Sequence, residues 1–243
     1  MAKEEFVLGT WTVLPSPAVI NVIAAAGFDY VIIDMEHGPM TFEKAEDMVR
    51  AAESKGCTPL LRVPANEEWL ILRGLEIGSH GILVPQITNK EAAQKAISAM
   101  KYYPQGTRGF SPYTRSGGYT SLKAKTLAKR KNRETLTALL VEGVEGIKNL
   151  GEILKIRHLD LIYLGTYDLT QSAGHPGEPD HPEVQKFVKK CVKQIRNKGV
   201  AVGCLAESQV KVKQWKKLGI QFIAYGADCS LLYHACLDIK ERF

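Results

Sequence analysis

Short apolar segments alternate with longer amphipathic ones along most of the chain. The short segments are rich in Val, Ile and Leu and are too short for helices, so they predict strands that are buried on both faces. They cover residues 6–13, 30–33, 59–63, 81–85, 137–141, 161–164, 200–205 and 222–225. A glycine stands shortly before several of them, at Gly27, Gly78, Gly199 and Gly219, which is typical of the end of a helix.

The longer segments repeat apolar residues at helical spacing. They predict helices over residues 18–26, 41–55, 67–77, 89–100, 144–156, 208–218 and 229–242, with one more that ends before Gly199. Thr41 and Asn89 are expected to cap two of these helices. Two long connections, residues 101–123 and 165–182, show no helical pattern, and connections of such length are usually functional or mobile.

Regular alternation of strand and helix predicts a parallel sheet with right-handed crossovers. Eight such units in 243 residues fit one (β/α)8 barrel, the TIM barrel, as a single domain over residues 1–243. The alternative is an open, doubly wound sheet. Against this alternative, no G-x-G-x-x-G follows a predicted strand, and no G-x-x-x-x-G-K-[ST] occurs in the chain.

The composition fits a cytoplasmic globular protein. Apolar residues make up 45% of the chain and charged residues 24%, and no apolar run is long enough to cross a membrane. Residues 1–5 lead directly into the first predicted strand and lack the apolar core of a secretion signal. The five cysteines are scattered and form no C-x-x-C pair, so we expect reduced thiols.

The net charge is +6, and a basic surface suits either nucleic acid or anionic small substrates. Much of the excess lies in Lys123–Arg133, a run without the interleaved aromatic residues or glycines that mark RNA-binding segments. We interpret this run as the solvated face of a surface helix and expect no nucleic-acid partner.

Charged and polar side chains gather where the predicted strands end. They are Asp34, Glu36 and His37 after the second strand, Arg62 on the third, Gln86 after the fourth, Glu142 after the fifth, and Thr166, Tyr167 and Asp168 after the sixth. In a barrel, the C-terminal ends of all strands share one mouth, and active sites lie there. The sequence therefore predicts one site built from these side chains.

Glu142 and Asp168 follow consecutive strands. Neighbouring strands lie roughly 5 Å apart, so two carboxylates at matching heights can hold one cation. No His or Cys stands beside them, and an all-oxygen ligand set favours Mg²⁺ or Mn²⁺ over zinc. The alternative is that each acid caps the helix that follows it.

His37 and Arg62 are the candidate catalytic residues. His37, with Asp34 three residues earlier, is either a general base oriented by an acid or an exposed residue of a turn. Arg62 either holds a carboxylate or developing oxyanion, or pairs with an acid of the barrel. No predicted strand contains a lysine, which argues against a Schiff-base aldolase. The chemistry would then run through a divalent ion, which as a Lewis acid can stabilise the enolate of a 2-oxo acid.

Several motifs carry a resemblance that spans nearly the whole chain. They are GFDYVIIDMEHGP, LLRVP, GILVP, YYPQGTRG, VEGVEGIKNL, GTYDLT and HPEVQ. Together they resemble the HpcH/HpaI family of class II, metal-dependent pyruvate aldolases. The resemblance implies cleavage of a 4-hydroxy-2-oxo acid to pyruvate and an aldehyde. It also implies a barrel whose last helix is exchanged between subunits, commonly in a homohexamer built as a trimer of dimers.

The resemblance assigns roles to the residues at the strand ends. It implies that Glu142 and Asp168 bind the metal and that His37 is a base paired with Asp34. It implies that Arg62 stabilises the pyruvate enolate.

The chain departs from the family pattern around the substrate. The backbone N–H groups of Thr166, Tyr167 and Asp168 are implied to bind the substrate carboxylate, but Gly-Thr-Tyr-Asp replaces the usual Gly-Pro-Ala-Asp. Leu140 stands where a glutamine is common, and Glu76 where an aspartate is often seen. These departures bear on the substrate more than on the fold.

Three functions remain open at this point. The first is the aldolase. The second is an acyl-CoA lyase of the citrate or malyl-CoA lyase type, in which Lys123–Arg133 would meet the CoA phosphates. The third is a barrel that binds a ligand or nucleic acid without turnover, which Leu140, Tyr167 and the basic charge would suit. Dependence on a divalent metal separates the first from the third, and binding of CoA identifies the second.

Overall fold

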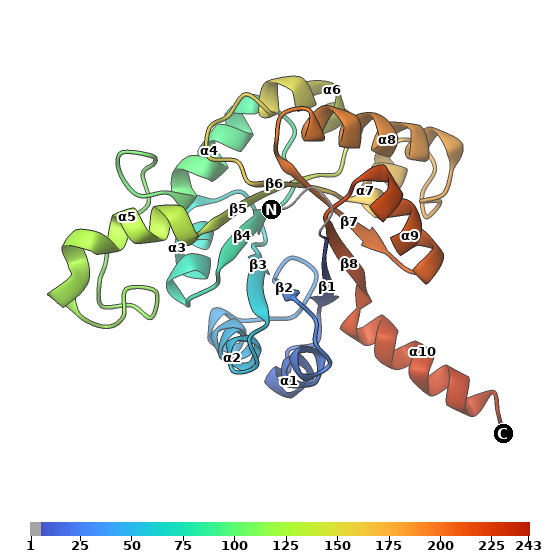
Figure 1. Ribbon diagram of the computed structural model, residues 1–243, viewed down its shortest axis with the longest axis horizontal. Coiled ribbons are helices and arrows are strands. Elements are labelled where there is room, and N and C mark those ends of the chain that lie inside the picture. The colour runs from blue at the N-terminus through green and yellow to red at the C-terminus, as the bar shows by residue number, and fades with distance from the viewer. Residues whose placement is uncertain (1–5) are drawn as a thin grey trace.

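The computed structural model describes residues 6–243 and confirms the barrel (Figure 1). Within these residues, the strands follow one another in chain order, and the sheet closes where β8 pairs with β1. The strands are β1 (Val7–Thr12), β2 (Tyr30–Asp34), β3 (Thr58–Arg62), β4 (Gly81–Val84), β5 (Leu136–Val141), β6 (Leu161–Leu164), β7 (Ala201–Ala206) and β8 (Phe222–Ala227). Closure excludes the open, doubly wound sheet. The expectation about a secretion signal concerns residues 1–5, which lie outside the described residues.

The predicted helices are also present, with small shifts at their ends. They are α1 (Pro17–Ala25), α2 (Phe42–Glu53), α3 (Glu68–Glu76), α4 (Lys90–Met100), α6 (Val144–Ile153), α8 (Pro182–Arg196), α9 (Gln209–Leu218) and α10 (Asp228–Lys240). The basic run forms α5 (Ala124–Glu134), after the 3-10 turn η1 (Ser121–Lys123). Leu127 is the buried residue of α5, which confirms a solvated surface helix.

One prediction about the connections is wrong. Residues 165–182 contain a short helix, α7 (Thr166–Ser172), where the sequence indicated only a loop. Its Leu169 and Thr170 are buried, so packing stabilises a segment whose polar residues hide the helical pattern. The consequence for the site is that residues 166–168 form a helical first turn.

Local capping fixes where the helices begin and end. The Thr41 hydroxyl accepts a hydrogen bond from the backbone N–H of Lys44 at 3.2 Å, and the Asn89 side chain accepts one from Ala92 at 2.8 Å. Gly219 ends α9 with φ at 89°, a left-handed conformation that glycine adopts without strain. These contacts confirm the two predicted N-caps.

Apolar side chains fill both faces of the barrel wall. The interior holds Tyr30, Ile32, Leu60, Leu83, Ala138, Leu140, Leu161, Tyr163 and Ala224, and a larger cluster packs between the strands and the outer helices. Two glycines make room for the interior aromatic rings, since a Cβ at Gly9 would lie 2.4 Å from the ring of Tyr30, and one at Gly203 would lie 2.5 Å from that of Tyr163. Within residues 6–243, side chains therefore fill the interior of the barrel below its mouth.

The last helix does not pack against the barrel along its length. In Figure 1, α10 extends away from the other helices toward the C-terminus. Asp228, at its start, is its buried residue, and the Asp228 carboxylate accepts hydrogen bonds from the backbone N–H groups of Val13 and Leu14. Leu232 and Tyr233 are more than half exposed. The exchange of this helix between subunits stays a prediction.

Among residues 6–243, no helix combines the length and apolarity that a membrane span requires. The cysteines are free thiols, of which Cys57, Cys191 and Cys204 are buried.

Candidate active site

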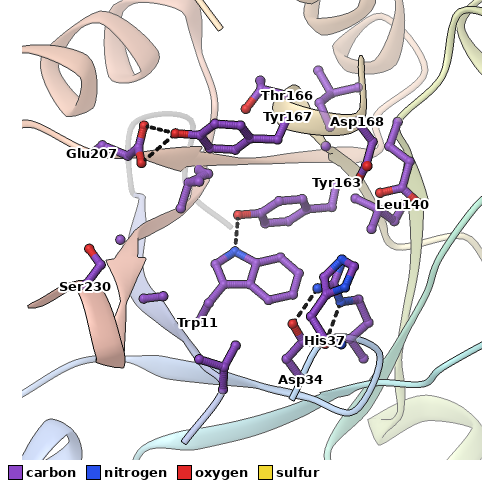
Figure 2. A pocket seen from close by; sticks show the side chains of 18 residues that line it. Trp11, Asp34, His37, Leu140, Tyr163, Thr166, Tyr167, Asp168, Glu207 and Ser230 are labelled. Atoms are coloured by element: carbon purple, nitrogen blue, oxygen red, sulfur yellow. Dashed lines mark hydrogen bonds and ion pairs between the residues drawn. The ribbon is translucent and has the colours of Figure 1, made fainter. Parts of the chain in front are cut away.

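A cavity of about 330 Å³ opens at the C-terminal ends of the strands (Figure 2). Every residue to which the sequence assigned a role lines it: Asp34, His37, Arg62, Glu142, Thr166, Tyr167 and Asp168. They lie at the end of, or shortly after, β2, β3 and β5, and at the start of α7. The barrel brings them together because parallel strands deliver their last residues to one mouth.

Arg62 lies at the centre of an ionic group. It is opposite Asp34 in the β2–β3 register. Its Nε donates to Asp34 Oδ1 at 2.9 Å, and one Nη donates to Oδ2 of the same carboxylate. The other Nη lies 3.2 Å from Glu36 Oε2, and the guanidinium stacks on Trp11 at 4.5 Å from the ring centroid. The salt bridge anticipated as an alternative is therefore present, and it fixes the guanidinium in the wall of the cavity.

The electrostatics of Arg62 favour a permanent charge. Burial alone lowers its pKa, but the hydrogen bond and charge of Asp34, with the charges of Glu36 and Glu142, raise it above the ordinary value. Arg62 therefore stays a cation facing a group of acids.

Asp34 was expected to orient the His37 side chain, but its carboxylate has other partners in the structure. Besides Arg62, its Oδ1 accepts hydrogen bonds from the backbone N–H groups of Glu36 at 2.9 Å and His37 at 3.2 Å. The carboxylate thus contacts the backbone of His37 and holds the turn. The predicted contact from Asp34 to the imidazole is not the one that the structure shows. A Cβ at Gly38 would lie 2.4 Å from the Asp34 carbonyl oxygen, so this turn requires glycine.

Glu142 carries the most perturbed carboxyl group of the site. Its side chain follows β5, is 7% exposed, and accepts a hydrogen bond at Oε1 from the backbone N–H of Gln86 at 2.7 Å. Burial raises the pKa of Glu142 to about 8; the Gln86 N–H and Arg62 oppose this rise, while Asp168 and Glu36 add to it. Arg62 and the Gln86 N–H do not outweigh burial, so a further positive charge would be needed to hold this carboxylate ionised.

Neither Glu142 nor Asp168 caps a helix, so that alternative is wrong. The N-cap positions of α6 and α7 belong to Gly143 and Gly165, and neither helix has a side-chain cap. A Cβ at Gly165 would lie 2.9 Å from Glu142 Oε2, so glycine leaves that oxygen accessible.

These groups fit a hard divalent cation. The Glu36 Oε2 atom is buried and has no hydrogen-bond partner among the described residues, although it lies near Arg62. Glu142 and Asp168 repel one another, and a cation between them would relieve that repulsion. The donors are all oxygen atoms, as Mg²⁺ and Mn²⁺ prefer.

The sequence placed Glu36 among the charged residues of the mouth but gave it no individual role. Its Oε1 accepts a hydrogen bond from the Gln86 side chain at 2.9 Å.

Two other pairs of residues in the site could not be predicted from the sequence, because their members are far apart in the chain. Trp11 Nε1 donates to the Tyr163 hydroxyl at 2.9 Å on the cavity wall. The Tyr167 hydroxyl contacts both carboxylate oxygens of Glu207 at 2.8 Å (Figure 2).

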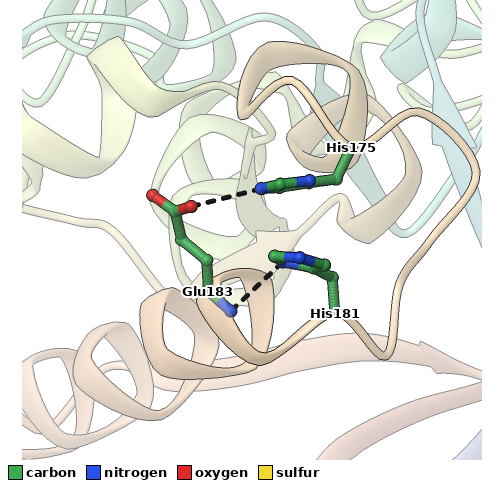
Figure 3. A group of neighbouring side chains, drawn as sticks. All are labelled: His175, His181 and Glu183. Atoms are coloured by element: carbon green, nitrogen blue, oxygen red, sulfur yellow. Dashed lines mark hydrogen bonds and ion pairs between the residues drawn. The ribbon is translucent and has the colours of Figure 1, made fainter.

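A second group of possible metal ligands lies in the connection between α7 and α8 (Figure 3). Ligand atoms of His175, His181 and Glu183 lie within 4.8 Å of one another. Their atoms already have partners: His175 Nε2 lies 3.2 Å from Glu183 Oε2, and His181 Nδ1 accepts the Glu183 backbone N–H at 3.3 Å. The imidazoles stack with centroids 3.4 Å apart. These contacts pair His175 with Glu183 and cap α8 through His181.

Known proteins share this fold and are similar in sequence over nearly the whole chain. Residues 8–235 match the family described as HpcH/HpaI aldolase/citrate lyase. The chain is 31% identical over 232 residues to 2-dehydro-3,6-dideoxy-6-sulfogluconate aldolase of Pseudomonas putida. The matched region covers 96% of this chain and 90% of that protein. It is also 31% identical over 237 residues to 4-hydroxy-2-oxo-heptane-1,7-dioate aldolase of Escherichia coli, and this match covers 97% of this chain and 90% of that protein. A solved HpcH/HpaI aldolase/citrate lyase family protein from Burkholderia cenocepacia J2315 superposes with a TM-score of 0.93 at 28% identity, over 98% of this chain and 95% of that chain.

Proposed function

The chain belongs to the HpcH/HpaI aldolase/citrate lyase family, and from that premise we propose that it cleaves a 4-hydroxy-2-oxo acid to pyruvate and an aldehyde. It is a lyase, like the relatives named as aldolases that match nearly its whole length. One observation supports the proposal above all others. Glu142 is buried at the mouth of the barrel beside two further acids, and Arg62 is fixed opposite them.

We propose Mg²⁺ or Mn²⁺ as the resident ion, with Glu142 and Asp168 as its protein ligands. The all-oxygen donor set supports this choice. When bound, such an ion supplies Lewis-acid stabilisation of negative charge on a 2-oxo acid. Without it, burial favours a protonated Glu142.

The side chains around the proposed metal position can supply the other groups that a retro-aldol cleavage requires. The reaction requires a base that takes the proton of the 4-hydroxyl, so that the C3–C4 bond breaks and an enolate of pyruvate remains. His37 lines the cavity and is the proposed base. The positive charge of Arg62 is proposed to stabilise the negative charge that develops on the oxo oxygen. The backbone N–H groups of residues 166–168 are proposed to bind the substrate carboxylate.

Exchange of the pyruvate methyl protons in D₂O, followed by proton NMR, tests the proposed half-reaction without a known aldehyde. We expect exchange with Mg²⁺ or Mn²⁺, loss of exchange with chelator, and strong reduction in His37→Ala. His80→Ala is the matched control, because His80 is on the surface and outside the cavity. Exchange that persists in chelator, or that is unaffected by His37→Ala, would contradict these roles.

A CoA-dependent lyase is the second candidate, since the family description includes citrate lyase. No pyruvate exchange with either metal, together with CoA binding that weakens when the lysines of α5 are neutralised, would favour this candidate over the aldolase.

We also propose that the protein is a cytoplasmic homo-oligomer in which α10 packs against a neighbouring subunit, as a trimer of dimers. The exposed apolar side chains of α10 and the free thiols support this proposal. Sedimentation of the full chain and of Leu232→Asp tests it, and we expect the variant to dissociate.

A further inference from the structure

The rim of the cavity carries a tyrosine–glutamate pair, Tyr167 and Glu207. Tyr167 is the second residue of α7 and Glu207 follows β7. Figure 2 shows the tyrosine ring reaching from the turn that holds Asp168 to Glu207, along one wall of the cavity. Its hydroxyl lies 2.8 Å from each carboxylate oxygen. The two side chains hold each other in place although both are partly exposed.

The pair keeps a negative charge at this rim. Burial and the hydrogen bond to Glu207 raise the pKa of Tyr167 to about 12, so the phenol stays a donor at neutral pH. The Glu207 carboxylate is the acceptor, and it lines the cavity together with Tyr167.

The charges nearby do not offset this carboxylate. Within residues 6–243, Arg62 is the arginine of the cavity lining, and it is bound by Asp34 and Glu36. Lys211 lies near Glu207 but pairs with Asp180 and stacks over the ring of Trp215. A second acidic group on a substrate would therefore meet an acid at this rim.

Resting on the function proposed above, we propose that Glu207, held by Tyr167, is a specificity-determining residue that disfavours aldehydes with an anionic tail. The substrates are then 4-hydroxy-2-oxo acids with an uncharged tail. As part of this proposal we place the pyruvate half against Glu142, Asp168 and Arg62 and direct the tail along the tyrosine ring to Glu207, which lines the same cavity. The Escherichia coli relative, by contrast, is named for a heptane-1,7-dioate, which carries a second carboxylate.

The test compares butanal with succinate semialdehyde in aldol addition to pyruvate with Mn²⁺. The two aldehydes have the same chain length and differ by a methyl group or a carboxylate at the far end. We expect wild type to have the higher kcat/KM for butanal. Glu207→Gln should raise the ratio of succinate semialdehyde to butanal about tenfold, because it removes one charge a few ångströms from the tail.

Two further variants separate charge from shape. Tyr167→Phe keeps the carboxylate and should leave the ratio no higher than in wild type. Glu43→Gln removes an exposed acid of α2 outside the cavity and should not change the ratio. In wild type, added salt should raise the ratio, because ions screen the repulsion.

The possible results are distinct. A wild-type preference for succinate semialdehyde, a ratio that ignores salt, or a ratio unchanged by Glu207→Gln would overturn the role of Glu207. If wild type shows no pyruvate exchange and no addition with either aldehyde, the proposed aldolase function itself fails.

Discussion

Two groups of acids and histidines in this molecule look like metal sites, and they differ in how their atoms are satisfied. In the α7–α8 connection, His175, His181 and Glu183 contact one another, and His181 caps α8. At the mouth of the barrel, Glu142 is repelled by Asp168, and its own burial keeps water from compensating. Closeness of ligating residues is common to both. Of these two groups, only the one at the mouth contains a buried carboxylate that a bound cation would stabilise.

The largest effect is expected from Glu142→Gln. If Glu142 is a ligand, the variant should lower pyruvate exchange about a thousandfold, since the Lewis acid is worth several kcal/mol and each 1.36 kcal/mol is tenfold in rate. His175→Ala, the matched change in the other group, should stay within about twofold, as expected for surface contacts. Equal losses in both variants would remove the distinction between the two groups.

Arg62→Lys should reduce exchange by about ten- to a hundredfold. Lysine keeps the charge but loses the planar fork that binds Asp34. Arg50→Lys is the control, because Arg50 pairs with Glu46 on the surface of α2. Wild-type exchange in Arg62→Lys would show that charge alone suffices there.

The pH dependence of stability tests the protonation of Glu142 directly. In metal-free protein its pKa is about 8, against an ordinary value of 4.5. The folded state then binds a proton that the unfolded state lacks, so this contribution to stability is full below pH 4.5 and is lost as pH rises through 8.

Urea unfolding of wild type and Glu142→Gln in EDTA measures this contribution. From pH 5.5 to 8.5, wild type should lose on the order of 2 kcal/mol relative to the variant. A difference that does not change with pH would mean that Glu142 is ionised throughout.

The smallest effect concerns the cap of α8. His181→Ala should cost about 1 kcal/mol of unfolding free energy by loss of the N-cap, and His181→Asn should restore most of it. Chelator should not alter either value. If chelator destabilises wild type by an amount that His181→Ala abolishes, this group holds a metal after all.

Most of the fold follows from local patterns in the sequence. Buried strands such as Tyr30–Asp34 are continuous apolar runs, and side chains such as Thr41 mark helix starts. The helix α7 was missed because buried Leu169 and Thr170 stabilise it by packing, which its polar sequence does not reveal.

The site divides in the same way. Residues at strand ends converge because every parallel strand ends at the same mouth, so Arg62 and Glu142 could be placed from the sequence. The pair Trp11–Tyr163 joins residues 152 positions apart, and its contact exists only once the barrel has closed. Likewise, the sequence predicted that Asp34 pairs with His37. The register of β2 and β3 instead places the Asp34 carboxylate opposite Arg62, with which it forms the salt bridge.

Binding of Mn²⁺, measured by the electron paramagnetic resonance signal of the free ion, tests most directly whether the mouth is the metal site. We expect wild type and His175→Ala to bind one Mn²⁺ per chain with similar affinity, and Glu142→Gln to bind at least about tenfold more weakly, because one of the proposed ligands is lost. Unchanged binding in Glu142→Gln, or loss of binding in His175→Ala, would contradict the assignment of the metal to Glu142 and Asp168.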